Sequence, residues 1–380
     1  MSYLENEENK TRISANNMQF FREGEKTPQE MVLFLREGAI FRSFDYLLRQ
    51  LYPEEDLGKR LTEGLEEITG ESHDSVSRKV RNWLKGKNIP KNRELLFQIC
   101  FVLELDEPAA NRLLAYASET GIHYRNPKEL VYAYGLRMGL SYGETAELNE
   151  REMKVYGPKM EKDQSEKHAS MYTRMVREAF DEVWSEEELT AFFQEYGEEL
   201  GTLHETAYQA FLSMLQKLQR PADLEDGARE ARYTVEEILN SYIRMKVPET
   251  KKVGDYSLLQ RLMKKYWPNE SSLLNMKNRR EDVGRKTIML LHLVTEMLET
   301  EAEDEEDFLW DEWEEDDPDA LLEERIAQMD LLLERYGMNQ LDLGSPFDLA
   351  MMYAMQAGEA DFMSDRMMQV LNLLFEGDEE

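Results

Sequence analysis

Apolar residues recur at helical spacing along most of the chain, and this periodicity limits the folds that the chain can adopt. One such helix face is formed by five residues of a single segment, Ala207, Phe211, Met214, Leu215 and Leu218. Signals for strands are nearly absent, because the sequence has no Asn-Gly hairpin turn and no sustained alternation of β-branched residues. We therefore predict an all-α fold.

Residues 95–105 (LLFQICFVLEL) are apolar on nearly all sides, so we predict a buried helix there. Cys100 lies in this segment and is predicted to be an inert core thiol. Because it is the only cysteine, the chain has no intramolecular disulfide and no zinc site built from cysteines alone. Six methionines near the C-terminus form either an adaptable groove for a partner or part of a helical core, and we favour the core: Met351, Met352, Met355, Met363, Met367 and Met368.

Basic residues concentrate in one short segment of an otherwise acidic chain. The formal net charge is −32, from 46 Lys and Arg against 78 Asp and Glu. Residues 75–93 nevertheless hold seven basic residues and no acidic one. Since a polyanion is repelled by nucleic acid and by anionic membrane surfaces, any such binding must come from this local patch.

The local structure of the basic segment is predictable. Asp74 or Ser75 can cap a helix that runs to a turn at Gly86, and Gly86 closes that helix in a left-handed C-cap. Pro90 prevents the helix from continuing, and a second, apolar helix begins near Asn92.

Residues 80–117 (VRNWLKGKNIPKNRELLFQICFVLELDEPAANRLLAYA) resemble the second half of a lambda-repressor-like (XRE-type) helix-turn-helix domain. The shared features follow one another in order: a helix ending in Trp83-Leu84, the turn Lys85-Gly86-Lys87, Pro90, an apolar helix and a closing helix at 109–114. The resemblance covers about residues 45–118. It implies a DNA-binding transcriptional regulator whose recognition helix enters the major groove while the first two helices support it.

Carried over residue by residue, the resemblance places four side chains on the exposed start of the recognition helix: Ser75, Ser77, Arg78 and Arg81. Arg can make a bidentate contact to guanine or to a phosphate. Four further cations lie in and after the turn and are expected to contact backbone phosphates: Lys85, Lys87, Lys91 and Arg93. Two other interpretations stay open, a solvated basic face that pairs with the protein's own acids, and a protein partner.

A second basic stretch at 261–286 repeats the pattern of a basic turn followed by an apolar helix. Its central cations are Lys277, Arg279, Arg280, Arg285 and Lys286. An offset of 193 aligns the two stretches and pairs Arg93 with Lys286; further on, three pairs recur in order, Gly121/Gly337, Pro127/Pro346 and Tyr134/Tyr353. These matches indicate a degenerate second copy near 235–355; the alternative is convergence of ordinary amphipathic helices. In the second copy, Glu281 and Asp282 favour loss of nucleic-acid contact.

We divide the chain into four parts: a flexible N-terminus (1–28), a helix-turn-helix-like module (29–142), a polar linker and helical middle block (143–232), and a second helical module (233–380). The linker is expected over 143–168, which is polar and contains Gly-Pro. The second module carries an insertion, 299–319, with 14 acidic residues in 21. This insertion either solvates, folds back on a basic stretch as a nucleic-acid mimic, or docks on a basic partner with Trp310 and Trp313 as anchors.

Catalytic motifs are absent from the sequence. It has no zinc-protease motif, no glycine-rich phosphate loop and no GxSxG, and its five histidines are dispersed. We therefore expect no metal, no cofactor and no enzymatic activity. The start of the sequence has no signal-peptide pattern and no apolar run reaches 18 residues, so we expect a cytoplasmic protein. DNA binding is the leading function; the alternative is an adaptor or inhibitor, acting on a protein or nucleoprotein, that keeps the helix-turn-helix fold as a scaffold.

Overall fold

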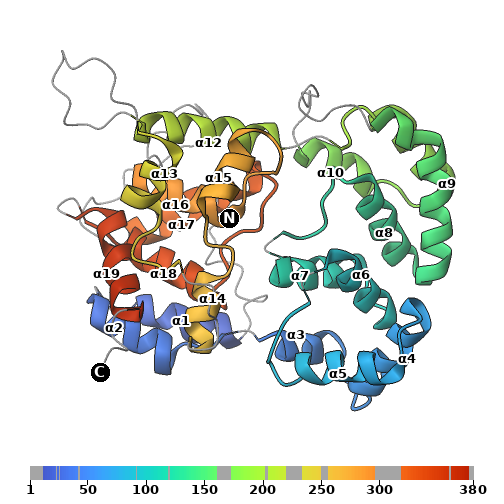
Figure 1. Cartoon of the computed structure of the whole chain (residues 1–380), viewed down its shortest axis with the longest axis horizontal. Helices are drawn as coiled ribbons and strands as arrows, with labels where there is room; N and C mark the ends of the chain where they lie inside the picture. The colour runs from blue at the N-terminus through green and yellow to red at the C-terminus, as the bar shows by residue number, and fades with distance from the viewer. Residues whose placement is uncertain are drawn as a thin grey trace. The chain divides into compact units, whose positions relative to one another are not determined.

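The structure is a computed structural model, and it describes residues 12–22, 24, 26–41, 43–90, 92–118, 120–160, 173–201, 204–219, 233–249, 256–295, 318–358 and 361–375. Over these ranges the chain forms 19 α-helices and two π-helical segments, without a strand (Figure 1). The prediction of an all-α fold is confirmed. Within the same ranges, no helix is long and apolar enough to cross a membrane.

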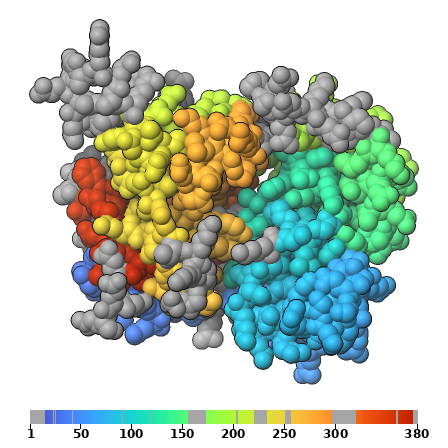
Figure 2. All heavy atoms as spheres, viewed as in Figure 1, coloured from blue at the N-terminus to red at the C-terminus, as the bar shows by residue number. Residues whose placement is uncertain are grey.

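The chain divides into two compact units, which we describe separately. The α3–α11 unit comprises residues 42–205 and 335–339. Its helices are α3 (Phe44–Leu51), α4 (Leu57–Thr69), α5 (His73–Trp83), α6 (Arg93–Val102), α7 (Glu107–Ser118), α8 (Pro127–Met138), α9 (Tyr142–Met160), α10 (Thr173–Asp181) and α11 (Glu186–Tyr196). In the view of Figure 2, atoms of its first helices, coloured blue to cyan, lie at the surface of the molecule.

The α12–α19 unit comprises residues 1–41, 206–334 and 340–380. Its helices are α1 (Arg12–Phe21), α2 (Pro28–Leu33), η2 (Phe34–Gly38), α12 (Glu205–Leu218), α13 (Val235–Ile238), η3 (Leu239–Ile243), α14 (Leu258–Lys264), α15 (Glu270–Lys277), α16 (Arg285–Thr295), α17 (Pro318–Arg335), α18 (Pro346–Met355) and α19 (Met363–Phe375). Because α2 packs against α19, the N-terminal residues belong to the same unit as the C-terminal helix, and the observed division differs from the predicted four parts.

The core of the α3–α11 unit is built around α6. Its residues 96, 97 and 99–102 are all buried, as expected for a helix that other helices surround. The predicted buried helix over 95–105 is therefore confirmed, although it ends at Val102. Glu104 follows with φ 51°, a left-handed conformation that does not continue the helix.

Two segments predicted to be loose are helical. The expected linker at 143–168 is part of α9 up to residue 160, because Ser141 and Glu144 cap the helix and Thr145 and Leu148 are buried. Residues 161–168 lie outside the described residues. In the predicted flexible N-terminus, Asn17 is fully buried and donates a hydrogen bond to the Leu343 carbonyl at 2.7 Å, which holds α1 in its unit.

In the α12–α19 unit the central element is α18, all ten residues of which are buried. Five of the six methionines singled out above are buried as well, and only Met368 is exposed. The methionines therefore belong to the core. The face predicted for α12 is also confirmed, because the same five residues are the buried ones.

Arg93, at the start of α6, is held inside the α3–α11 unit. Its Nε and Nη2 atoms donate to the two carboxylate oxygens of Glu129 at 2.7 and 2.6 Å. Nη2 also donates to the Gly121 carbonyl at 2.7 Å, and Nη1 donates to the Ser118 hydroxyl at 2.7 Å. We call Arg93, Gly121 and Glu129 the Arg93 clamp; it ties the start of α6 to the start of α8.

The same arrangement recurs in the α12–α19 unit. Arg285, at the start of α16, donates through Nη1 and Nη2 to the carboxylate of Asp348 at 3.1 and 2.8 Å. Its Nη2 atom donates also to the Gln340 carbonyl at 2.9 Å. These three residues form the Arg285 clamp, which ties the start of α16 to the start of α18. The contacts therefore pair Arg93 with Arg285, one residue before the predicted Lys286.

A third contact repeats in both units, next to each clamp. In the α3–α11 unit, Oδ1 of Asn111 accepts the backbone N–H of Ile122 at 2.8 Å. In the α12–α19 unit, Oδ1 of Asp330 accepts the backbone N–H of Leu341 at 2.7 Å. The two partners are 11 residues apart in each case, so an equivalent side chain holds an equivalent loop.

Candidate nucleic-acid interface

The basic segment begins in α5, the second of two helices, α4 and α5, that a short turn connects. Helix α4 ends at Thr69, and Gly70 follows in the left-handed conformation with φ 67°. Only residues 70–72 separate the two helices, which is the length and composition of a helix-turn-helix turn. The helices also pack directly against each other.

Helix α5 has one buried and one exposed face. Val76, Val80 and Trp83 are buried at helical spacing, and this packing turns Arg78 and Arg81 outward. The predicted N-cap at Asp74 or Ser75 is wrong, since the helix begins at residue 73.

The turn after α5 forms as predicted. Gly86 has φ 64°, and the N–H of Lys87 donates to the Asn82 carbonyl at 2.9 Å, which is the left-handed closure of a Schellman motif. Asn92 then caps α6, because its side chain accepts the N–H of Glu94 at 2.8 Å.

Four of the predicted nucleic-acid contacts are exposed cations on α5 and its turn: Arg78, Arg81, Lys85 and Lys87. We call them the α5 cation set. Among the described residues, none of the four side chains makes an ion pair or a hydrogen bond. The first three are spaced i, i+3 and i+7, so they lie along one side of the helix and the turn that follows it. The set is therefore available to an external anion.

The N-terminal half of α5 is different, because carboxylates surround it. Glu71 accepts hydrogen bonds from the Ser75 hydroxyl at 2.8 Å and from Lys79 Nζ at 2.7 Å. The Lys79 side chain, followed by Ser75, holds the pKa of Glu71 below its usual range. His73 lies 3.0 Å from Glu66. Ser75 is thus hydrogen-bonded within the protein, and Ser77 is half-buried. The carboxylates at the N-terminal end of α5 oppose its entry into a DNA groove, because DNA is itself negatively charged.

Two predicted phosphate contacts fall outside this surface. Arg93 is held in the Arg93 clamp, where its side chain is 24% exposed and Glu129 neutralises its charge. It is therefore not placed to make the phosphate contact that we predicted for it. Lys91 lies outside the described residues.

Three cations of the second basic stretch contact other groups of the protein. Arg285 belongs to the Arg285 clamp, and Lys286 is 3% exposed and donates from Nζ to the Met263 carbonyl at 2.9 Å. Arg279 stacks on the ring of Tyr208 at 4.3 Å. These three cations are therefore held within the protein, as in the interpretation in which the second copy has lost nucleic-acid contact. Of the two remaining central cations, Arg280 is exposed and Lys277 is half-exposed.

The turn between α15 and α16 nevertheless keeps the geometry of the turn after α5. Arg279 has φ 54°, and the N–H of Arg280 donates to the Asn275 carbonyl at 2.8 Å. The backbone pattern thus repeats, while the charges that it presents do not.

The acidic insertion is only partly within the described residues. Helix α17 begins at Pro318, inside the predicted insertion, whereas Trp310, Trp313 and the rest of 299–317 lie outside the described residues. The three interpretations of this segment therefore stay predictions.

Cys100 is fully buried, which raises its thiol pKa far above the usual range, as expected for an inert thiol. The described residues contain no group of His, Cys, Asp and Glu able to hold a metal ion.

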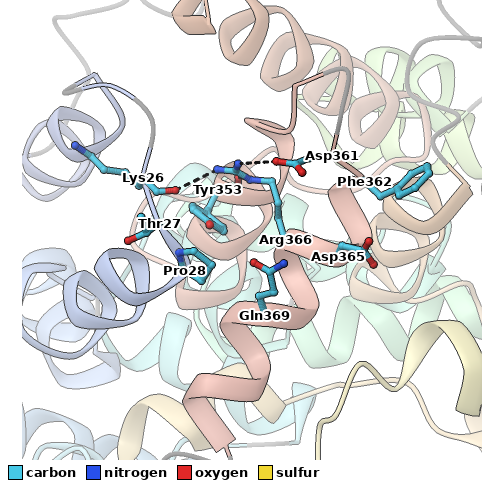
Figure 3. Close-up of a pocket in the computed structure, with 9 residues that line it drawn as sticks. All are labelled: Lys26, Thr27, Pro28, Tyr353, Asp361, Phe362, Asp365, Arg366 and Gln369. Atoms are coloured by element: carbon cyan, nitrogen blue, oxygen red, sulfur yellow. Dashed lines mark hydrogen bonds and ion pairs between the residues drawn. The ribbon is translucent and has the colours of Figure 1, made fainter.

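A cavity of about 610 Å³ opens beside the start of α19 (Figure 3). Arg366 crosses it and is 5% exposed. Its guanidinium stacks on Tyr353 at 4.4 Å, lies 3.7 Å from Asp361 and donates to the Lys26 carbonyl at 3.4 Å. Figure 3 shows this side chain held between those groups, so we assign it a structural role in joining α19 to the N-terminal segment.

The chain matches no protein-family model, no curated protein and no solved structure. Its function must therefore be inferred from its own residues. The sequence also carried a signal that the prediction missed. Each clamp uses a carboxylate two residues after a helix-starting proline, in Asn-Pro-Lys-Glu (126–129) and Ser-Pro-Phe-Asp (345–348). A buried acid at that position is stabilised by a cation, and in both units the cation is the arginine at the start of the second helix before it.

Proposed function

We propose that this chain is a non-enzymatic DNA-binding transcriptional regulator that contacts the duplex through the α5 cation set. The observation that carries the proposal is the exposure of Arg78, Arg81, Lys85 and Lys87 on a helix-turn-helix element of a chain whose net charge is −32. Four clustered cations without internal partners among the described residues are suited to neutralise phosphates.

The arrangement of charge on α5 favours contact with the DNA backbone over extensive base reading. The cations occupy the C-terminal half of the helix and the turn, while Glu71 and Asp74 lie at the other end. In helix-turn-helix proteins the N-terminal residues of the recognition helix contact base edges. Arg78 and Arg81 are then the two side chains of the set best placed to reach the groove.

We also propose that the two units descend from one duplicated helix-turn-helix-type module, related in fold to lambda-repressor-like domains. The matched clamps, the matched loop contact and the matched left-handed turns support this proposal. Independent helices at convergent spacing have no reason to share three sets of hydrogen bonds in one order. The second copy has kept the clamp, and it holds Arg279, Arg285 and Lys286 internally, so we assign the DNA contact to the α3–α11 unit.

Binding is tested by fluorescence anisotropy of the full chain with a random-sequence DNA duplex, as a function of salt. Four phosphate contacts predict a slope of about −3.6 for log affinity against log salt concentration. The double variant Arg78→Glu/Arg81→Glu should abolish binding while its circular dichroism spectrum stays unchanged. Arg112→Glu is the matched control, because Arg112 is an exposed cation on α7, outside the α5 cation set. Equal loss of binding in the control would refute the interface.

A second function is favoured by a specific observation, the carboxylates around the N-terminal half of α5 together with the acidity of the whole chain. Long-range repulsion opposes approach to DNA, and the same cations can bind an acidic protein surface. On this alternative the chain is an adaptor or inhibitor acting on a protein or nucleoprotein. Absence of duplex binding at low salt, with the α5 cation set intact, would favour it.

A further inference from the structure

Asp330 is a buried carboxylate at a position where the other unit has an amide. It lies on α17, is 4% exposed, and its Oδ1 atom accepts the Leu341 N–H. Its Oδ2 atom is buried and has no hydrogen-bond partner among the described residues. Asn111, the equivalent residue of the α3–α11 unit, makes the same loop contact with an uncharged side chain that is only half-buried.

The charged groups around Asp330 do not compensate its charge. Arg285, from α16, attracts the carboxylate, but its terminal nitrogens donate to Asp348 and to the Gln340 carbonyl. Asp348, from α18, and Glu334, from α17 itself, repel it. The loop contributes one N–H, from Leu341, and this hydrogen bond favours the ionised form.

We propose that Asp330 is a pH-sensing residue, whose deprotonation destabilises the α12–α19 unit by opening the junction between α17 and α18. The ionised carboxylate carries a buried oxygen, Oδ2, to which no described residue donates, and it gains hydration when the junction opens. The neutral acid gains much less hydration on opening, because it carries no charge, and it stays buried. The proposal is independent of any binding by α5.

The expected pH range follows from the burial of the group. Burial raises the pKa of Asp330 from the ordinary value of 3.8 to about 7. Because the folded-state pKa is the higher one, the stabilisation is complete below about pH 4 and is lost as pH rises to about 7. The change is therefore spread over the whole interval between about pH 4 and about pH 7.

The test compares the full chain with its Asp330→Asn variant, which keeps the size of the side chain and the Leu341 contact. The variant lacks the titrating group. The unfolding equilibrium constant of the wild type, divided by that of the variant, should therefore rise roughly tenfold per pH unit between pH 5 and 6.5 and level off above about pH 7.5. Hydrogen exchange of peptides spanning 340–345 should accelerate with pH in the wild type beyond the intrinsic rate, and Asp330→Asn should remove that excess.

Asp365→Asn is the control, since Asp365 is an exposed carboxylate of the same unit. It should leave the pH dependence of wild type unchanged. A pH-independent ratio between wild type and Asp330→Asn would overturn the proposal. An Asp365→Asn variant that behaves like Asp330→Asn would overturn it as well, because the effect would then be one of general charge.

Discussion

Removing the carboxylate of the Arg93 clamp tests whether Arg93 serves the fold or an external ligand. The change is Glu129→Ala. Arg93 and Glu129 side chains are 24% and 8% exposed, and the pair is bidentate with contacts of 2.7 and 2.6 Å. The variant leaves a largely buried guanidinium without its anion, and it also removes the acceptor of the His123 N–H.

The expected loss is about 4 kcal/mol of unfolding free energy, within the range for removing one member of a buried ion pair. For a unit of this size, that loss lowers the melting temperature by roughly 10 °C. Calorimetry of the full chain measures the shift, and hydrogen exchange of α6 and α8 peptides assigns it to the α3–α11 unit.

The double variant Arg93→Met/Glu129→Met supplies the comparison. Replacing both charges removes the uncompensated guanidinium, so most of the loss should be recovered. About 1–2 kcal/mol should stay lost, because the carbonyls of Thr120 and Gly121 lose their donor. A loss below about 1 kcal/mol in Glu129→Ala would refute the clamp. So would an Arg93→Met variant that weakens DNA binding without losing stability.

Three further predictions concern single positions. Gly86→Ala should lower stability by about 1 kcal/mol in chemical denaturation, because an L residue is strained at φ 64° while the added Cβ meets only Asp45 Oδ1 at 3.5 Å; an unchanged midpoint would contradict the left-handed turn. Cys100 should resist iodoacetamide at pH 8 until denaturant is added, and labelling of the native chain would show that the core opens. Burial lowers the pKa of His292 to about 4, so the stability that its neutral form provides is lost as pH falls from about 6.5 to about 4; wild type and His292→Leu should diverge over that window in acid unfolding, and parallel curves would refute the shift.

Elements defined by local pattern were predictable from the sequence. The helical periodicity of α12, the apolar surface of α6 and the glycine closure at residue 86 all depend on residues close together in the chain. The predicted linker failed for the opposite reason. A polar segment becomes a helix when one narrow face, here Thr145 and Leu148, finds a neighbour to pack against, and composition does not report that neighbour.

The sequence by itself determined that the chain is helical, that its cations gather in two stretches, and where the turns beside them fall. Only the tertiary structure decided which cations are free. Arg93, Arg285 and Lys286 look like surface charges in a linear reading, yet each meets acceptors supplied by residues more than 20 positions away. Burial is set by such distant contacts, and the environment of a charge follows from its burial. The same holds for Asp330: the sequence supplies the carboxylate, but the packing that buries it, and so raises its pKa, comes from the tertiary structure.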